Sequence, residues 1–374
     1  MNPKVAILTQ PLHTNYGGTL QAYALQTIVK SVGAEVVTLN YQTKPKFFLR
    51  FLLSVIKSFV LNRKDKFPLL SSEKLVIEKY HTEFIKKHIN RSEIILSELD
   101  LIKHFNNTEY DAIIVGSDQV WRVEYSPNID NFFLNVYTGS AKRISYAASF
   151  GIDEWQFTPE KTSEIETWLG KFDAISVRED SAVTLCKNYL NLKAYHVLDP
   201  TLLLTKEYYL NLIKKSPQKD TGIFTYILDS SQEKNNIVAN ISKKLGLNTF
   251  QNQPIKKFKT NFFIKKEDDY VYPKIEDWLA AFRDASFIIT DSFHGTVFSI
   301  IFNKPFITVA NRERGVARFS SLLKIFNLEH RLISSLDQLT NDLILSNIDF
   351  NEVNTILDHE RENSLQLLYK QINL

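Results

Sequence analysis

The sequence has very few of the residues that build covalent or metal-based cross-links. Cys186 is the only cysteine among 374 residues, so the chain forms no internal disulfide and has no cysteine-based metal site. A spaced histidine cluster of the His-Glu-x-x-His type is also missing, and we expect neither a metal nor another cofactor. Glycine and proline are modest at 11 residues each, which favours an ordered chain over long flexible linkers.

Long hydrophobic runs are missing as well. No apolar run reaches the roughly 18 residues of a membrane-spanning helix, and the first residues show no signal-peptide pattern. We therefore expect a cytoplasmic protein. The net charge is only +3, too small to indicate nucleic acid as a partner.

One apolar stretch, residues 47–66, needs a separate interpretation. It is too short to span a bilayer, and it carries Arg50, Lys57, Arg63, Lys64 and Lys66. This composition fits a segment that lies in a membrane interface. It fits equally a helix that packs on the N-terminal half or on a partner subunit. Oligomer formation is left open by the sequence.

Short apolar runs alternate with helical patterns along the whole chain, without internal repeats. Residues 4–9, a helix over 19–32 and a strand over 35–39 form a β-α-β unit. Further strands are predicted at residues 111–115, 143–148, 174–177, 222–228, 287–290 and 306–309. Such alternation is typical of an α/β fold with parallel sheets.

The chain length favours two domains. We place a Rossmann-like domain at residues 1–205, a second at 206–350 and a C-terminal helix at 351–374. The two domains are expected to face a common cleft.

Loops that follow predicted strands are the candidate binding sites, because ligands of open α/β sheets bind beyond the carboxyl ends of strands. The two glycines of residues 15–18 let the backbone approach a ligand at a helix start, although they also suit a tight turn. In residues 116–121, Asp118 is placed to accept a proton from a sugar hydroxyl and Trp121 to stack on a sugar ring. The alternative is a helix cap beside a core tryptophan.

Residues 291–296 form the most informative of these loops. A strand end, a polar loop with His294 and a glycine at a helix start together favour a bound anion. His294 would then be held for acid–base work near neutral pH. A structural histidine is the alternative.

Several arginines also follow predicted strands. Arg178 could hold a carboxylate or phosphate in a bidentate fork, or merely form a surface ion pair with its acidic neighbours. Arg312, Arg314 and Arg318 stand close together after the strand at 306–309. They indicate either an anion-binding loop or a solvated basic loop.

Taken in order, six blocks resemble the polysaccharide pyruvyl transferase family. These blocks are residues 15–25, 116–121, 145–151, 176–179, 199–203 and 294–295. The resemblance implies a fold similar to the two-domain glycosyltransferase type called GT-B, with the acceptor on the N-terminal domain and the donor on the C-terminal one. It implies phosphoenolpyruvate as donor and a sugar of a bacterial surface polysaccharide, or its polyprenyl-diphosphate-linked precursor, as acceptor. The product would be a cyclic pyruvate ketal.

The resemblance implies functional roles for His294 and Arg178, and the loops described above supply the other candidates. His294 and Asp118 would be catalytic. Phosphoenolpyruvate would contact Arg178, Ser292, Gly295, Arg312, Arg314 and Arg318. The acceptor would contact Asn15, Tyr16, Gly17, Gly18, Ser117, Gln119 and Trp121.

Ser292 marks a departure from the family pattern. Many family members carry an arginine two residues before the histidine, where this chain has Ser292. One of the three arginines at 312, 314 and 318 is the expected replacement.

Two other functions stay open at this stage. A GT-B-like glycosyltransferase that uses a nucleotide sugar would share the cleft, and an inactive scaffold of polysaccharide assembly is kept open by Ser292. If the acceptor is lipid-linked, the protein would work at the cytoplasmic face of the membrane, which the composition of residues 47–66 fits.

Overall fold

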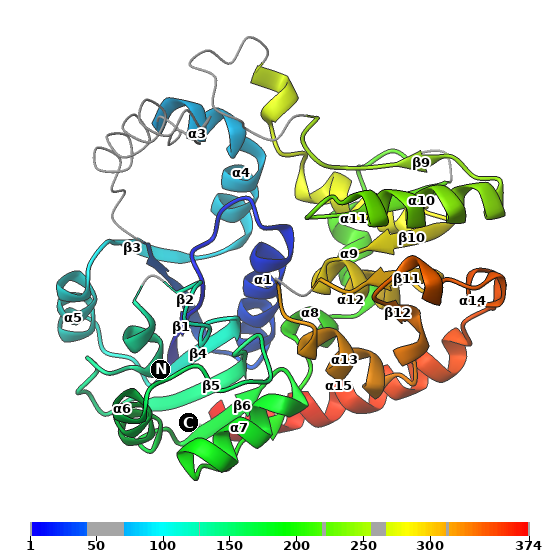
Figure 1. Cartoon of the computed structure of the whole chain (residues 1–374). Helices are drawn as coiled ribbons and strands as arrows, with labels where there is room; N and C mark the ends of the chain where they lie inside the picture. The colour runs from blue at the N-terminus through cyan, green and yellow to red at the C-terminus, as the bar shows by residue number, and fades with distance from the viewer. Residues whose placement is uncertain are drawn as a thin grey trace, which may run out of the picture.

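Two parallel sheets, each flanked by helices, lie side by side in the computed structural model (Figure 1). The structure describes residues 2–42, 71–126, 128–218, 222–255, 267–311 and 314–372. Residues 47–66 and Arg312 therefore lie outside the described residues. None of the helices in these ranges has the length and apolar character needed to cross a membrane.

Within the described residues, the first sheet has seven parallel strands in the order β3-β2-β1-β4-β5-β6-β7. The strands are β1 Lys4–Leu8, β2 Glu35–Tyr41, β3 Arg91–Ile95, β4 Ala112–Asp118, β5 Lys142–Ala148, β6 Ala174–Val177 and β7 Tyr195–His196. The accompanying helices are α1 Tyr16–Ser31, α3 Ser71–Ile77, α4 Lys79–His88, α5 Glu98–Asn107, α6 Pro159–Leu169 and α7 Asp180–Leu190. The central strand β4 is buried along its whole length, as expected where helices cover both faces of a parallel sheet.

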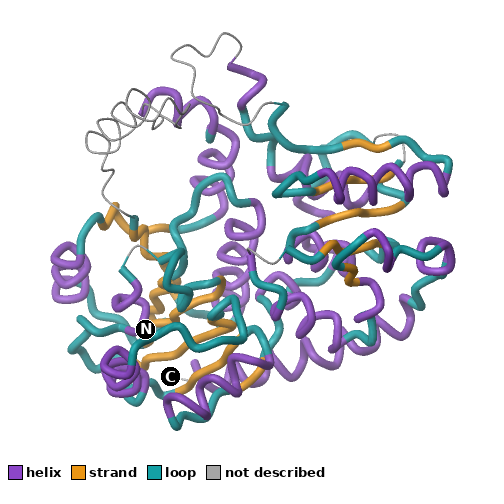
Figure 2. The backbone as a smooth tube through the Cα atoms, viewed as in Figure 1, coloured by secondary structure: helices purple, strands orange, loops and turns teal. Residues whose placement is uncertain are grey.

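The second sheet has five described strands in the order β12-β11-β10-β8-β9. They are β8 Ile223–Tyr226, β9 Thr249–Phe250, β10 Phe287–Thr290, β11 Phe306–Val309 and β12 Leu332–Ile333. The helices that follow β7 are α8 Pro200–Leu203, α9 Lys206–Leu212, α10 Gln232–Leu245, α11 Ile275–Asp284, α12 Phe293–Ile301, α13 Ala317–Ile325, α14 Asn341–Leu345 and α15 Phe350–Ile372. Short 3-10 helices are η1 Ile129–Phe133, η2 Glu267–Tyr270, η4 Glu329–Arg331 and η5 Leu336–Gln338. Figure 2 shows both groups of strands enclosed by helices.

The predicted elements are largely confirmed, but two helices begin earlier than expected. Helix α1 starts at Tyr16 rather than at residue 19, because the Asn15 side chain caps it by accepting from Gly18 N at 3.1 Å. Helix α12 starts at Phe293 rather than at residue 296, because Ser292 caps it by accepting from Gly295 N at 3.3 Å. Both predicted loops therefore belong to the first turns of helices, where the first backbone N–H groups have no partner within the helix.

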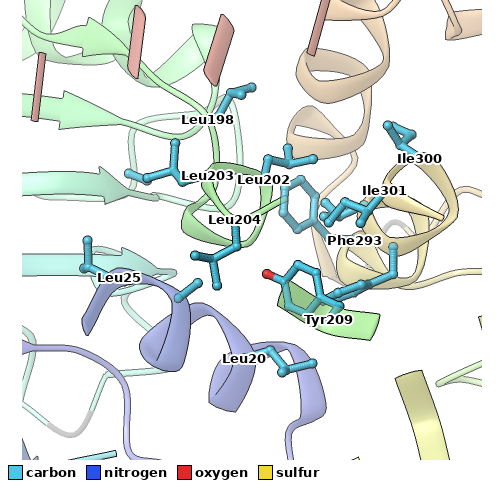
Figure 3. Packing of buried hydrophobic residues seen from close by; sticks show 14 of the residues in the cluster. Leu20, Leu25, Leu198, Leu202, Leu203, Leu204, Tyr209, Phe293, Ile300 and Ile301 are labelled. Carbon is cyan, nitrogen blue, oxygen red and sulfur yellow. The ribbon is translucent and has the colours of Figure 1, made fainter. Parts of the chain in front are cut away.

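One hydrophobic cluster runs from the first sheet to the second. It joins Leu20 and Leu25 of α1, through Leu202 and Tyr209, to residues of α12 such as Phe293 and Ile301. Figure 3 shows these side chains meeting at the junction. The C-terminal helix α15 also returns to the first half, where the Ser364 hydroxyl accepts from Leu198 N at 3.1 Å. The two halves are therefore joined by a continuous hydrophobic core rather than by a hydrated interface.

Candidate active site

A hollow of 520 Å³ lies between the halves. It is lined by residues at the carboxyl ends of β4, β8 and β10, by the first turns of α1 and α12, and by α13. This is the position at which α/β sheets bind ligands. Among the described residues, no group of three side chains is arranged to hold a metal ion.

His294 stands where the two halves meet. Its side chain is nearly buried, with 7% of the residue exposed, and lines the hollow. On one side it faces Gly17 of α1, where any Cβ atom would overlap the imidazole ring. On another side, His294 Nε2 lies 3.6 Å from Asp199 Oδ2. Glycine at position 17 is therefore required by this close approach.

Asp199 is a buried carboxylate that connects His294 to Arg178. Its Oδ2 accepts from Arg178 Nη1 at 3.0 Å, and its Oδ1 accepts from the Thr201 hydroxyl at 2.6 Å. Burial raises the pKa of Asp199, but His294 and Arg178 lower it more, and the net pKa lies well below the usual value. Asp199 is therefore ionised and fixed in orientation at neutral pH.

Arg178 does not line the hollow, in contrast to the expectation that it contacts phosphoenolpyruvate. Its guanidinium lies behind the wall, 4.7 Å from the centre of the Phe293 ring. Nη2 is 3.4 Å from Asp118 Oδ1, so the two carboxylates Asp118 and Asp199 occupy its two terminal nitrogens. Burial lowers the pKa of Arg178, but the two carboxylates raise it by a larger amount, so the net pKa lies above the usual value. The geometry makes Arg178 a residue that positions two carboxylates.

Arg318, on the first turn of α13, is one of two described arginines that line the hollow. Only 5% of the residue is exposed, and its guanidinium lies 5.4 Å from the centre of the Phe293 ring. Among the described residues, no carboxylate comes within ion-pair distance of it, and Nη2 donates to the Arg314 carbonyl at 2.5 Å. Burial, together with the charge of Arg178, lowers the pKa of Arg318 to about 10. The Asp118 and Glu179 carboxylates act in the opposite direction from a greater distance. A buried guanidinium that has no ion-pair partner among the described residues is a candidate contact for an anion.

Arg314 lines the hollow too, but its charge is already matched. Its Nε and Nη2 donate to the two carboxylate oxygens of Asp229 at 2.5 and 3.2 Å. The hydrogen bonds from Arg314 lower the pKa of Asp229 to about 2. Arg314 therefore has less attraction for an added anion than Arg318 has.

Asp291, which directly follows β10, anchors the loop that carries Asp229. The fully buried Asp291 carboxylate accepts from Leu228 N at 2.6 Å, from Asp229 N at 3.1 Å and from Lys234 Nζ at 2.6 Å. The sequence showed this aspartate only as part of a polar loop. Its structural role explains why an acidic residue stands next to Ser292 in a site suited to anions.

Asp118 ends β4 and projects to the hollow. Its φ is 76°, in the left-handed region where Asp is among the few tolerated non-glycine residues. The side chain is largely buried, and Oδ1 accepts from Gln119 N at 2.9 Å. A residue held in this conformation by its surroundings is common at functional sites.

Trp121 was expected to stack on a sugar, and the structure places it in the core instead. It is 1% exposed, its Nε1 donates to the Phe132 carbonyl at 3.1 Å, and its ring packs against Phe133 and Phe150. Ser117 is also fully buried, and its hydroxyl donates to Gln21 at 2.7 Å. Neither side chain reaches a ligand in the hollow.

The remaining predicted acceptor residues do lie near the hollow. Asn15, Tyr16 and Gln119 line it. Tyr16 is held in place by stacking on Trp278 at 5.2 Å and by donating to the Pro273 carbonyl at 2.9 Å. Gly17 and Gly18 form the first turn of α1, and Ser292 and Gly295 form the start of α12.

The comparisons with known proteins agree with this architecture. A family model described as polysaccharide pyruvyl transferase matches residues 15–313. Among solved structures, Arabidopsis thaliana UGT89C1 complexed with UDP-L-rhamnose aligns with a TM-score of 0.52 at 15% identity, covering 100% of each chain.

UDP-N-acetylglucosamine 2-epimerase from Rickettsia bellii aligns with a TM-score of 0.51 at 11% identity, covering 100% of this chain and 98% of the other. At these identities the likeness concerns the fold alone, and it confirms the predicted GT-B-like pair of Rossmann-like halves. None of the curated proteins is detectably similar in sequence.

Proposed function

The chain belongs to the polysaccharide pyruvyl transferase family, and we propose that it moves pyruvate from phosphoenolpyruvate onto a sugar of a bacterial surface polysaccharide or its lipid-linked precursor. The product is a cyclic ketal across two hydroxyls. The observation that supports this proposal most directly is the buried Arg318, which has no ion-pair partner among the described residues and lines, together with His294, the hollow between the two sheets. The second half supplies the donor site, and the first half supplies the acceptor site.

Donor binding uses the positive potential of the second half. Phosphoenolpyruvate carries a carboxylate and a phosphate, and the Arg318 guanidinium holds one of them in a charge-assisted pair. The first turn of α12, at Phe293 and His294, offers backbone N–H groups and the positive end of the helix dipole to the other, while Gly295 N donates to the Ser292 cap. Arg318 thereby takes the place of the arginine that family members carry at the position of Ser292.

His294 acts as the acid–base group, and Asp199 orients it. The Asp199 carboxylate, itself held by Arg178 and Thr201, lies 3.6 Å from His294 Nε2 and faces the ring from a fixed position. Asp118 accepts the proton of the attacking sugar hydroxyl, since its carboxylate lines the same hollow. Arg178 pairs with both Asp118 and Asp199. Because Asp199 lies beside His294, Arg178 helps to position the two proton-transfer groups, Asp118 and His294, relative to each other.

The reaction proceeds by addition and then elimination at C2 of the donor. Protonation of the methylene carbon turns the enol double bond into a methyl group and leaves an oxocarbenium ion at C2. A sugar hydroxyl adds to C2 and loses its proton. The C2–O bond to phosphate then breaks, inorganic phosphate leaves, and a second hydroxyl adds with loss of its proton to close the ketal. Cationic groups around the donor stabilise the leaving phosphate.

The test measures phosphate release from phosphoenolpyruvate in the presence of polyprenyl-diphosphate-linked mono- and disaccharides, with mass spectrometry to detect the pyruvylated product. Arg318→Gln should raise the KM for phosphoenolpyruvate about tenfold or more, because a charge-assisted contact is lost. His294→Gln should lower kcat by about 100-fold or more. Lys324→Gln is the matched control, since Lys324 lies exposed on the same helix and pairs with Asp180.

Three outcomes decide the matter. Product from the wild type that depends on Arg318 and His294 supports the proposal. An Arg318→Gln variant with unchanged phosphoenolpyruvate affinity by calorimetry contradicts the donor assignment. Failure to bind phosphoenolpyruvate, together with binding of a nucleotide sugar, would favour the glycosyltransferase alternative.

The lipid-linked acceptor and a contact of residues 47–66 with the cytoplasmic membrane face form a separate part of the proposal. They rest on the basic and apolar composition of that stretch. Sedimentation with vesicles that contain anionic lipid tests the contact. Replacing Arg50, Lys57, Arg63 and Lys64 with Gln should release the protein, and unchanged sedimentation would contradict it.

A further inference from the structure

A second hollow, of 550 Å³, adjoins the first on the side of the seven-stranded sheet. The two hollows share the lining residues His13, Asn15, Asp118, Gln119 and Arg314. The outer wall of the second hollow is made by residues 10–13 and 124–126. This second hollow opens next to the Asp118 carboxylate, where the acceptor must present its hydroxyl.

Arg122 organises three side chains of this wall. Its Nη1 donates to Gln119 Oε1 at 3.0 Å, its Nε donates to Glu124 Oε2 at 3.0 Å, and its guanidinium lies 4.4 Å from the centre of the Tyr125 ring. Arg122 itself is almost buried, with 6% exposed. One fixed guanidinium therefore sets the positions of an amide, a carboxylate and an aromatic ring.

Tyr125 is the exposed aromatic residue of this wall. It remains 41% exposed although it lines the hollow, and the contact with Arg122 supports its ring by a cation–π interaction. Another part of the wall is also fixed, because Gln10 Nε2 donates to the Gln119 carbonyl at 2.9 Å and to the Ser126 hydroxyl at 2.8 Å. A wall held this way loses little conformational entropy when a ligand binds.

Two glycines bring Arg314 to this site. Gly151, with φ 79°, leaves no room for a side chain because a Cβ atom would overlap the Gln119 side chain. Gly315, with φ 87°, in turn approaches the Gly151 carbonyl so closely that a Cβ atom there would overlap it. The backbones of the two halves thus meet beside the second hollow, which makes it continuous with the donor site.

We propose that the second hollow is the subsite for the acceptor sugar ring, and that Tyr125 is its stacking face. A pyranose presents an apolar C–H face and a rim of hydroxyls. The Tyr125 ring covers the face, while the Glu124 and Asp118 carboxylates accept hydrogen bonds from the rim. The mixture of carboxylates with Arg314 suits a neutral sugar better than a charged one. This assignment rests on the proposed function, and it transfers to Tyr125 the stacking role that Trp121 cannot fulfil.

The test observes glycoside binding by saturation-transfer NMR, with the methyl glycosides of glucose, galactose and N-acetylmannosamine as probes and acyclic sorbitol as a polyol without a ring. We expect saturation of at least one glycoside and none of sorbitol. Tyr125→Ala should raise the Kd of that glycoside about tenfold, whereas Tyr125→Phe, which keeps the ring, should leave it within about threefold. Tyr189→Ala is the matched control, because Tyr189 is similarly exposed but stacks on Trp155 at 5.0 Å.

Phosphoenolpyruvate calorimetry on the same variants separates the two levels of the argument. Equal glycoside binding by wild type and Tyr125→Ala, or no glycoside binding at all, overturns the subsite even if phosphoenolpyruvate binds normally. If the wild type does not bind phosphoenolpyruvate, the proposed function is overturned, regardless of the result with the glycosides. Unchanged phosphoenolpyruvate affinity in Tyr125→Ala, together with weakened glycoside binding, is the expected result.

Discussion

His81 makes the protein sensitive to acid through a group that takes no part in the chemistry. It lies on α4 with 0% exposed, its ring 4.5 Å from that of Tyr16 and 5.8 Å from that of Tyr272. Among the described residues, neither ring nitrogen has a hydrogen-bond partner. Burial, helped by the positive charge that His13 can carry, lowers the pKa of His81 to about 3.

The size of the effect follows from the two pKa values. The unfolded chain binds a proton on this imidazole below about pH 6.5, whereas the folded chain does so only near pH 3. Acid therefore favours unfolding throughout that window. At pH 5, about 1.5 pH units below the unfolded pKa, His81 should cost about 2 kcal/mol of stability relative to pH 8, at about 1.36 kcal/mol per pH unit.

Urea denaturation of wild type and His81→Phe at pH 8, 6 and 5 measures this cost. Phenylalanine has a similar shape and cannot bind a proton, so the variant should lose about 2 kcal/mol less than the wild type between pH 8 and pH 5. His359→Phe, at an exposed position of α15, should retain the pH dependence of the wild type. Parallel pH profiles for wild type and His81→Phe would refute the reasoning.

Three further substitutions test the site. Gly17→Ala should displace the His294 ring and lower kcat for pyruvyl transfer about 100-fold, while phosphoenolpyruvate affinity by calorimetry stays close to that of wild type. Asp199→Asn should remove a partner from buried Arg178 and reduce the free energy of unfolding in urea by about 3–5 kcal/mol; a loss below 1 kcal/mol would mean that the pair is not truly buried. Trp121→Ala should cost about 3–5 kcal/mol as a core truncation, and a raised acceptor KM at unchanged stability would show that the residue binds sugar after all.

The fold was predictable from the sequence because buried parallel strands appear as short apolar runs. The runs at 4–9, 111–115 and 287–290 match β1, β4 and β10 closely. The position of His294 followed from the same rule, since a strand end followed by a helix start places a side chain at the ligand-binding edge. The starts of α1 and α12 were predicted three residues too late, because Asn15 and Ser292 act as helix caps and the residues directly after them are already helical.

The pairing of charged groups was much harder to predict. Arg178 was correctly placed after a strand, yet its partners Asp118 and Asp199 come from elements distant in sequence, and the direction of each side chain depends on packing. Asp199 precedes a proline at a helix start, and this pattern predicts a helix cap. It does not predict that the carboxylate also lies beside His294. The sequence predicted a group of three arginines at 312, 314 and 318, but the position of Arg318 against Phe293 depends on the packing of α13.

Trp121 shows a different limit. A tryptophan after a strand is compatible with both a core and a binding platform, and the sequence contains no feature that separates the two. The exposed ring belongs to Tyr125, which lies four positions after Trp121 in the same loop. Exposure depends on which side of the loop the first sheet covers, and that is a property of the folded chain.

The shared core restricts how this protein can be recombined. Leu20 and Leu25 of one half pack through Leu202 and Tyr209 against Phe293 of the other, so a cut between the sheets would expose an apolar face on each fragment. A chimaera that takes its donor half from a relative would place unmatched side chains across this surface. Exchange of donor or acceptor specificity is therefore better attempted by grafting loops at the carboxyl ends of strands, which leave the junction intact.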